Sequence, residues 1–382
     1  MIYLDNAATT YPKPPCVMHA VAHAMQYAGG NPGRSGHPLS LAAAELMWDC
    51  RESAAEFLGC ASPENVIFTM NCTMSINIVL KGLLARGGRV LISDMEHNAV
   101  MRPLHSLARR GFVKIDVAEV TADAEETVVN FRRKITPETR AIVCIHASNV
   151  FGVAAPIRAL GQTARLYGLP FVVDGAQSAG VLPLNMAADN IDFLCLPGHK
   201  GLYGPMGTGL LLCSGRFPLA PLIEGGTGTQ SLDLRQPDTL PERLESGTPN
   251  VAGICGLRAG IEWVRAQGVT AVAAHECRCI APLYRTLKSL PNVQLYAPAP
   301  RAGIDAPILS FSVDGVPSEA IADRLHAAGV AVRAGYHCAP AAHKKFGSPD
   351  GGTVRLAPSA FTSPRAAQDA GRILYNIVTK FL

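Results

Sequence analysis

Short apolar runs alternate with segments of helical spacing between about residues 60 and 215. The runs are rich in β-branched residues and read NVIFTM, RVLISD, VKIDVAEV, AIVCIHASN, FVVDGA, DFLCLPG and GTGLLLC. Strands that alternate with helices in this way build a mostly parallel sheet covered by helices. The pattern therefore predicts an α/β fold for this part of the chain.

The pattern changes after the segment LESGTPNVAG. Two long helical patterns, at about 252–267 and 270–290, precede the short apolar runs NVQLYAP, PILSFSV and GVAVRAG and a final helix. This order is typical of a separate α+β unit. The sequence thus predicts an N-terminal arm over residues 1–15, a large domain over 16–250 and a smaller α+β C-terminal domain over 251–382.

Composition narrows the class of protein. Of the 382 residues, 48% are hydrophobic and 17% are charged, so most of the chain should pack into cores. The net charge of +4 is modest and the basic residues are scattered, so we expect no nucleic acid partner. The start MIYLDNAATT has no signal-peptide pattern, and no window reaches roughly 18 consecutive apolar residues, so we expect a cytoplasmic protein with no membrane partner.

The eleven cysteines are irregularly spaced and include no CxxC pair, as expected in a reducing compartment. The nearest approach to a metal cluster is HECRC, where only His275 and Cys279 share a helix face, so buried thiols are favoured and we expect no metal. The glycine-rich segments GGTGTQS and GPMGTG lack the Gly-Lys-Ser/Thr ending of a phosphate loop, which disfavours a nucleotide site.

Polar residues follow the apolar runs at the positions where the predicted strands end. Doubly wound sheets bind ligands beyond these carboxyl ends. The residues are Asn71, Thr73, His97, Asn149, Asp174, Gln177, His199 and Lys200.

Two of these residues point to one cofactor. Asp174 follows the buried run FVV, and Lys200 follows DFLCLPGH. An aspartate at this edge can pair with a pyridinium nitrogen, and a lysine one strand later can form an imine with an aldehyde, which is the layout of a pyridoxal phosphate (PLP) site. Each residue alone also fits an ordinary role, as a helix N-cap or a solvated surface charge.

The neighbouring strand ends favour the PLP interpretation. The segment NCTMSIN opens a helix whose free N–H groups, with the hydroxyl of Thr73, can bind a phosphate. His97 follows another strand, where its imidazole can stack on a flat ring.

The segment RAGYHCAP in the C-terminal part carries Cys338. Arg333 and His337 can supply positive charge there, and Gly335 lets the backbone bend so that a side chain points outward. We therefore expect a reactive thiol rather than a core cysteine, provided that the small domain folds this segment over the cofactor.

Over essentially its whole length the sequence resembles the class V, fold-type I PLP enzymes, and among them the cysteine desulfurases and selenocysteine lyases. The motifs that carry the resemblance are YLDNAATT, GRSGHPLS, FTMNCTMSIN, MEHNAV, HASNVFG, VVDGAQSAG, PGHKGLYGPMGTG, ESGTPN, RAGYHCAP and TVRLAPS. The form R-x-G-x-H-C-A around Cys338 is similar to the SUF-type, group II branch.

The resemblance implies a role for each catalytic residue. Lys200 bonds covalently to PLP and later moves the Cα proton of the substrate, and Cys338 attacks the substrate sulfur. Asp174 pairs with the pyridine nitrogen, His97 stacks on the ring, and Gln177 bonds near the phenolic oxygen.

The resemblance also implies the binding residues. The residues around the phosphate are Asn71, Cys72, Thr73, His199 and, from the partner subunit of a homodimer, Thr248. The residues that bind the substrate are Arg355, Asn149 and Arg333. Three departures from the family pattern affect these regions: Pro197 and the pair Asn71–Cys72 near the phosphate, and Tyr336 beside the thiol.

The implied activity is that of a cysteine desulfurase, which converts L-cysteine to L-alanine and leaves a persulfide on Cys338 for a sulfur-acceptor protein, as in iron–sulfur cluster assembly. The alternative is a selenocysteine lyase acting on L-selenocysteine, or another PLP-dependent C–S lyase. A PLP-binding scaffold without turnover is a rival of another class, but it has no need of a reactive thiol.

Overall fold

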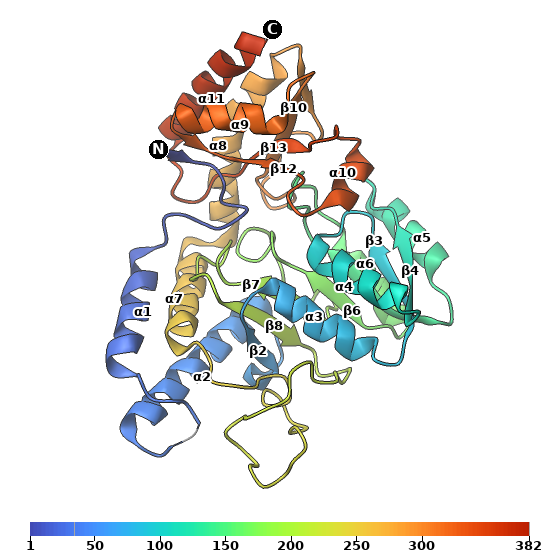
Figure 1. Ribbon diagram of the computed structural model, residues 1–382, viewed down its shortest axis with the longest axis vertical. Coiled ribbons are helices and arrows are strands. Elements are labelled where there is room, and N and C mark those ends of the chain that lie inside the picture. Colours follow the sequence, from blue (N-terminus) through green and yellow to red (C-terminus); the bar gives the residue numbers. More distant parts are fainter. Residues whose placement is uncertain (34, 382) are drawn as a thin grey trace.

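A seven-stranded sheet forms the centre of the computed structural model, which describes residues 1–33 and 35–381 (Figure 1). Its spatial order is β2-β8-β7-β6-β5-β3-β4. The strands are β2 (Val66–Thr69), β3 (Gly88–Ser93), β4 (Val113–Ala118), β5 (Thr139–Ile145), β6 (Phe171–Asp174), β7 (Phe193–Pro197) and β8 (Gly209–Cys213). Strand β8 is antiparallel to both of its neighbours, β2 and β7, and the other pairs in this sheet are parallel, so the predicted mostly parallel α/β fold is confirmed.

Helices cover both faces of this sheet because successive strand side chains point to opposite sides. On β3, Leu91 packs in one core while Val90 and Ile92 pack in the other. The helices of this part are α1 (Pro15–Tyr27), α2 (Pro38–Leu58), α3 (Cys72–Leu83), α4 (Asn98–Arg109), α5 (Ala124–Lys134), α6 (Ile157–Leu166) and α7 (Val251–Gln267), with a short 3₁₀ helix at Pro63–Asn65. Helices α3 and α4 lie together on one face.

The C-terminal part contains a four-stranded antiparallel sheet of order β12-β13-β10-β9. Its elements are α8 (Val269–Lys288), β9 (Val293–Leu295), β10 (Leu309–Val313), α9 (Ser318–Ala327), β11 (Val330–Ala331), β12 (Arg333–Gly335), α10 (Pro340–Phe346), β13 (Thr353–Leu356), α11 (Pro364–Val378) and a 3₁₀ helix at Thr379–Phe381. Helices α8, α9 and α11 enclose a separate apolar core with this sheet.

The N-terminal arm connects the two parts. Strand β1 (Ile2–Tyr3) pairs in parallel with β11, so the arm begins beside the C-terminal sheet and then runs down to α1. Helix α7, which the predicted division assigns to the C-terminal domain, packs on α1 and α2. The domain boundaries themselves stay a prediction, and Arg34 of the motif GRSGHPLS and Leu382 lie outside the described residues.

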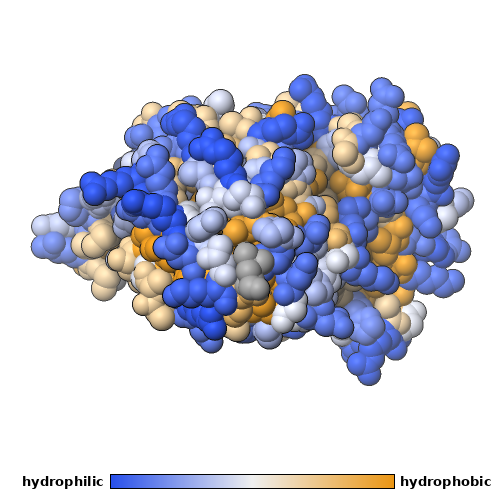
Figure 2. Space-filling model, turned by 90° about the horizontal axis from the view of Figure 1, so that it is seen from above, coloured by the Kyte–Doolittle hydropathy of each residue, from blue (hydrophilic) through white to orange (hydrophobic). Residues whose placement is uncertain are grey.

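The surface seen from the C-terminal end is mostly hydrophilic, with apolar patches between the charged groups (Figure 2). Residues 214–250, between β8 and α7, form a long loop on which Leu232 and Leu234 are fully exposed. Within residues 1–33 and 35–381, no helix is long and apolar enough to cross a membrane.

Candidate active site

The carboxyl ends of the central strands enclose a cavity of about 90 Å³. Its lining consists of Asn71, Cys72, Thr73, His97, Ala99, Ile145, Asn149, Asp174, Ala176, Gln177, Pro197, His199 and Lys200. All eight polar residues that the sequence places at strand ends are among them. They converge because β5, β6 and β7 are parallel neighbours and because α3 and α4 begin at the same edge.

Asp174 is the last residue of β6 and is only 2% exposed. Its Oδ1 accepts hydrogen bonds from the Ala176 backbone N–H at 2.9 Å and from Cys72 Sγ at 3.5 Å. Burial, followed by the neighbouring Asp174 charge, raises the pKa of the Cys72 thiol well above its usual value, so the thiol keeps the proton that it donates. Among the described residues Asp174 Oδ2 has no partner, so this oxygen remains free for a ligand.

Lys200 follows β7 and lines the same cavity. No described residue makes a hydrogen bond or ion pair with its Nζ. Burial lowers the pKa of this amine, and the positive charge of Arg355 lowers it further. A lowered pKa increases the fraction of neutral amine, which is the form that attacks a carbonyl carbon and accepts a proton.

His97 caps the N-terminus of α4, where its Nδ1 accepts a hydrogen bond from the Ala99 backbone N–H at 3.0 Å. A ring nitrogen that accepts a hydrogen bond carries no proton, so the neutral ring has its proton on Nε2. Burial lowers the pKa of His97, which favours this neutral form. The cavity therefore has a flat, uncharged ring on one side.

The start of α3 and the turn before Lys200 form the other end of the cavity. The Asn71 side chain caps α3 by accepting from the Met74 backbone N–H at 2.9 Å, so its amide oxygen is already used. Thr73 is exposed in the first turn. Burial, together with the charge of Lys200, lowers the pKa of His199 to about 4, and its buried Nδ1 has no hydrogen-bond partner among the described residues.

The unpartnered atoms around the cavity test whether PLP fits. Buried polar atoms are normally hydrogen-bonded, so each exception needs an explanation. PLP offers an aldehyde carbon to Lys200 Nζ, a ring nitrogen to Asp174 Oδ2 and phosphate oxygens to His199 Nδ1. Gln177 donates through Nε2 to the Ala7 carbonyl oxygen at 2.9 Å, which leaves its Oε1 for the cavity. The residues present fit this cofactor.

Arg355 lies in β13 and is only 1% exposed. Its guanidinium donates to Asp5 Oδ1 at 2.9 Å and to the Asn149 carbonyl oxygen at 2.8 Å, while its buried Nε has no partner among the described residues. Arg333 lies directly opposite Arg355 on β12. The C-terminal sheet thus contributes two neighbouring cations beside Asn149 at the edge of the cavity.

Cys338 lies on an exposed turn between β12 and α10. His337 and Cys338 both adopt left-handed backbone angles, with φ of 49° and 59°, which non-glycine residues adopt at some cost. Their carbonyl oxygens accept hydrogen bonds from Asn149 Nδ2 at 2.7 Å and from the Asn98 backbone N–H at 2.8 Å. These bonds attach the turn to the large domain, next to the cavity.

The thiol of Cys338 has one cationic neighbour. Its Sγ lies 3.8 Å from Arg333 Nη2. His337 is buried, its Nε2 donates to the Thr353 carbonyl oxygen at 3.0 Å, and burial, followed by the charge of Arg355, lowers its pKa to about 2. The prediction that His337 supplies positive charge to the thiol is therefore wrong, because a buried neutral imidazole carries none.

Thr248, the residue predicted to bind the phosphate of the partner subunit, lies outside the cavity. Thr248 is exposed, accepts from Asn31 Nδ2 at 3.4 Å and lines a separate cavity of about 680 Å³. Its predicted contact was with the neighbouring subunit of a dimer and stays a prediction.

In the segment HECRC, His275 and Cys279 both form hydrogen bonds with the Thr362 carbonyl oxygen. The described part of the chain holds no cluster of three metal ligands.

The N-terminal arm contributes to the site in a way that the sequence analysis missed. Asp5 pairs with Arg355, the Ala7 carbonyl accepts from Gln177, and Lys13 Nζ donates to the His199 carbonyl oxygen at 2.8 Å. The signal in the sequence that could have identified these contacts is the presence of a carboxylate, Asp5, and a lysine, Lys13, in a short, Pro-rich arm with no other charged side chain.

A buried carboxyl group also escaped the sequence analysis. Glu96 Oε1 accepts from the Ser93 hydroxyl at 2.6 Å and from the Ile145 backbone N–H at 2.8 Å. Burial raises its pKa to about 8, so it holds a proton at neutral pH. It therefore adds no charge beside Asp174.

Comparisons with known proteins agree with this geometry. The sequence pattern of the family described as Aminotransferase class-V matches residues 2–363. A probable cysteine desulfurase of Vibrio cholerae is 32% identical over 99% of this chain and 93% of its own, and one of Methanothermobacter thermautotrophicus is 34% identical over 98% and 94%.

Solved structures give the same result. The apo structure of the cysteine desulfurase from Thermococcus onnurineus superimposes with a TM-score of 0.90 at 31% identity, covering 99% of this chain and 95% of that one. The cysteine desulfurase CsdA from Escherichia coli gives a TM-score of 0.85 at 27% identity, covering 99% and 94%.

Proposed function

The chain belongs to the aminotransferase class-V family of PLP-dependent enzymes, and on this basis we propose that it is a cysteine desulfurase. It converts L-cysteine to L-alanine and leaves the sulfur as a persulfide on Cys338. The observation that carries the proposal is the exposed Cys338 thiol beside Arg333, on a turn bonded directly to the first N–H of α4. A PLP enzyme without a sulfur nucleophile has no use for a thiol in this position.

Four residues hold the cofactor in this proposal. Lys200 would bind its aldehyde carbon, Asp174 its ring nitrogen and His199 its phosphate, and His97 would contact its ring. When bound, PLP withdraws electrons from the substrate's α-carbon, which makes the α-proton acidic.

The residues of the chain itself have separate roles in the reaction. Arg355, fixed by Asp5 and the Asn149 carbonyl, binds the substrate carboxylate through its free Nε. Lys200 Nζ, with its lowered pKa, takes the α-proton and later returns a proton to the product. Arg333 Nη2, which lies 3.8 Å from Cys338 Sγ, donates to the sulfur and holds the side chain of Cys338 in place for the attack.

Sulfur transfer forms one bond and breaks one. The Cys338 thiolate attacks the sulfur of L-cysteine, a new S–S bond forms, and the C–S bond breaks with its electron pair going to the substrate. Protonation of the former C–S carbon completes L-alanine. Atoms and electrons balance because one thiol and one L-cysteine give one persulfide and one L-alanine.

The wider assignments rest on the same site. We infer a homodimer in which Thr248 reaches the partner's phosphate, supported by its exposure and by Leu232 and Leu234 on the loop before it. We also infer that a separate protein accepts the sulfur and that the enzyme has a SUF-type role, which includes iron–sulfur cluster assembly. We infer a cytoplasmic location because all eleven cysteines are free, as expected in a reducing compartment.

A substrate panel tests the proposal. Purified holoenzyme is given L-cysteine, L-selenocysteine or cysteine sulfinate with a reductant, or L-cystine without one because a reductant converts L-cystine to L-cysteine, and alanine and pyruvate are quantified. We expect alanine from L-cysteine, which Cys338→Ala abolishes and Cys16→Ala, at the other exposed cysteine, leaves unchanged. Activity on L-selenocysteine alone would favour a selenocysteine lyase, and pyruvate formation by the Cys338→Ala variant would favour a C–S lyase.

A further inference from the structure

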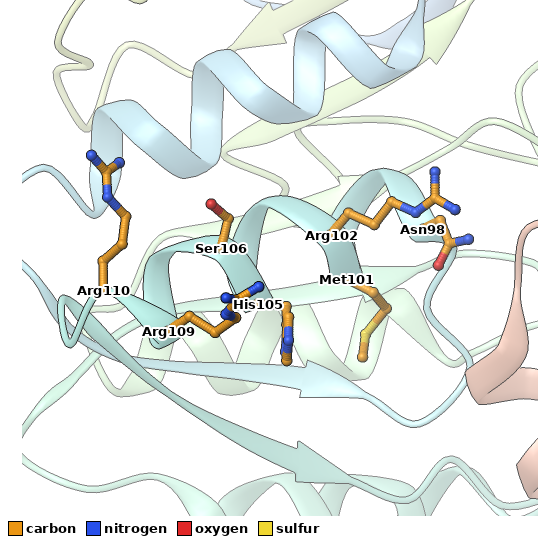
Figure 3. Close-up of a pocket in the computed structure, with 7 residues that line it drawn as sticks. All are labelled: Asn98, Met101, Arg102, His105, Ser106, Arg109 and Arg110. Atoms are coloured by element: carbon orange, nitrogen blue, oxygen red, sulfur yellow. The ribbon is translucent and has the colours of Figure 1, made fainter.

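Helix α4 presents a basic face that begins at the cysteine turn. The backbone N–H of Asn98, the first residue of α4, donates to the Cys338 carbonyl at 2.8 Å. From there a groove of about 560 Å³ follows the helix surface (Figure 3). Its lining residues, which we call the α4 surface, are Asn98, Met101, Arg102, His105, Ser106, Arg109 and Arg110.

The spacing of these residues makes one continuous face. Residues 98, 101, 102, 105 and 109 recur three or four positions apart, which places them above one another on an α-helix. Arg102, His105 and Arg109 are exposed, and Figure 3 shows Arg102 beside Asn98 at the start of the helix and Arg109 at its far end.

The positive charges of the α4 surface are not neutralised within the chain. Among residues 1–33 and 35–381, Arg102, Arg109 and Arg110 make no ion pair. Asp94, in the loop that leads from β3 to α4, is already paired with Lys345. A partner with carboxylates would therefore meet free guanidinium groups.

Helix stability explains only part of this pattern. Cations in the last turn interact favourably with the helix dipole, which accounts for Arg109 and Arg110. Arg102 lies in the N-terminal half of α4, where a positive charge gains nothing from the dipole. Its place on the same face as Arg109 points instead to a ligand that contacts the helix along its length.

The length of the α4 surface indicates which kind of ligand could contact all of it. Twelve residues at 1.5 Å each give α4 a length of about 18 Å, far longer than an amino acid substrate. A macromolecule is needed to contact both ends. A protein fits better than a nucleic acid, because the face starts at a sulfur nucleophile and only a protein supplies a thiol that can take the sulfur.

We propose that the α4 surface docks an acidic segment of a separate protein and thereby brings that protein's acceptor cysteine to Cys338. The inference rests on the proposed desulfurase function. The acceptor thiolate attacks the outer sulfur of the Cys338 persulfide, a new S–S bond forms, the old one breaks, and Cys338 leaves as a thiolate that accepts a proton. No external oxidant or reductant is needed.

Charge reversal on the α4 surface tests the proposal. The probes are two short peptides with one cysteine each, one rich in Glu and the other with every Glu replaced by Gln. Holoenzyme loaded with L-cysteine is mixed with either peptide, and persulfide on the peptide is measured over time. The variant is Arg102→Glu/Arg109→Glu, and the matched control is Arg132→Glu/Arg133→Glu, which makes the same charge change at exposed arginines of α5 without an ion pair.

We expect the native enzyme to transfer sulfur to the acidic peptide about tenfold faster than to the neutral one at low ionic strength, with the difference shrinking at about 0.3 M salt. The α4 variant loses this preference and the α5 variant keeps it. A milder variant, Arg102→Gln/Arg109→Gln, shows an intermediate loss and excludes misfolding as the cause. Equal rates for both peptides with the native enzyme, or an unchanged preference in the α4 variant, would overturn the proposal.

Two further readouts separate this proposal from the proposed function. Alanine formation with dithiothreitol as acceptor stays unchanged in the α4 variant if the surface serves docking alone. If no alanine forms in any variant, the desulfurase function fails, and fluorescence anisotropy of a labelled Glu-rich peptide still tests the surface on its own. Preferential binding of a short DNA oligonucleotide over the Glu-rich peptide would contradict a protein partner.

Discussion

The cofactor cavity and the cysteine turn are built in opposite ways. In the cavity, Asp174, His97 and Lys200 project from strand ends and a helix cap, and burial shifts the pKa of His97 and of Lys200. On the turn, Cys338 is exposed, has a left-handed backbone and is attached to the large domain by two hydrogen bonds. Proton transfer benefits from a rigid, partly dry site, whereas a sulfur carrier must meet both the substrate and a partner.

The comparison predicts that damage to the cavity stops all chemistry, while damage to the turn stops only sulfur transfer. The largest effect is expected for Lys200→Ala. We expect alanine formation to fall by about 10³-fold or more, because the group that binds PLP and moves the α-proton is gone. Borohydride reduction followed by peptide mapping should label Lys200 in the native enzyme, with Lys81→Ala, at an exposed lysine in the last turn of α3, as a control that keeps the label. A label on another residue would show that the cofactor assignment is wrong.

A second prediction tests the proposed homodimer, in which Thr248 of one subunit reaches the phosphate site of the other. Lys200→Ala and Thr248→Ala subunits are each expected to be nearly inactive alone. In verified heterodimers both changes fall in one site and the other site is intact, so activity should return to roughly half of the native value per dimer. Failure of heterodimers to recover activity would contradict the sharing of sites.

The cationic neighbour of the thiol gives a smaller effect confined to the turn. Arg333→Gln should slow alanine formation about tenfold, because the guanidinium donates to Cys338 Sγ at 3.8 Å and holds the thiol in place. Arg333→Lys should recover part of the rate. PLP absorbance should not change. Loss of bound PLP in Arg333→Gln would instead show that Arg333 contributes to cofactor binding.

The smallest predicted effect is the pH dependence of stability that comes from Glu96. Its pKa is raised from 4.5 to about 8 in the folded protein, so the folded state keeps a proton that the unfolded chain releases. Stability from this group is therefore full below about pH 4.5 and is lost as the pH rises toward 8.

The isosteric change Glu96→Gln removes this titration and should flatten the stability curve. The native protein should lose about 1 kcal/mol or more relative to Glu96→Gln between about pH 6 and about pH 9 in urea unfolding. Glu125→Gln, an exposed residue in the first turn of α5, serves as the control. Parallel curves for the native protein and Glu96→Gln would mean that Glu96 is ionised in the folded state.

The sequence predicted the cavity better than the turn, for a physical reason. Short apolar runs rich in β-branched residues locate the buried strands, and parallel strands end at one edge, so Asp174 and Lys200 could be brought together without a structure. The reversed direction of β8 depends on pairing that no local pattern encodes.

Long-range contacts explain what the sequence analysis missed. The burial of His337 follows from the pairing of β12 with β13, and the Asp5–Arg355 ion pair joins residues 350 positions apart. Glu96 and Cys72 become neighbours of Asp174 only once the sheet has formed. The local sequence pattern thus predicts which residues lie at the edge of the sheet. The charge state of those residues depends on the distant segments that bury them.

Mass spectrometry of the protein after brief turnover tests the central claim most directly. Holoenzyme is mixed with L-cysteine without reductant, quenched with an alkylating agent and digested. The account predicts one added sulfur atom on the peptide that contains Cys338, its absence in Cys338→Ala, and its presence in Cys16→Ala. An unmodified Cys338 peptide together with undiminished alanine formation in Cys338→Ala would contradict the desulfurase mechanism.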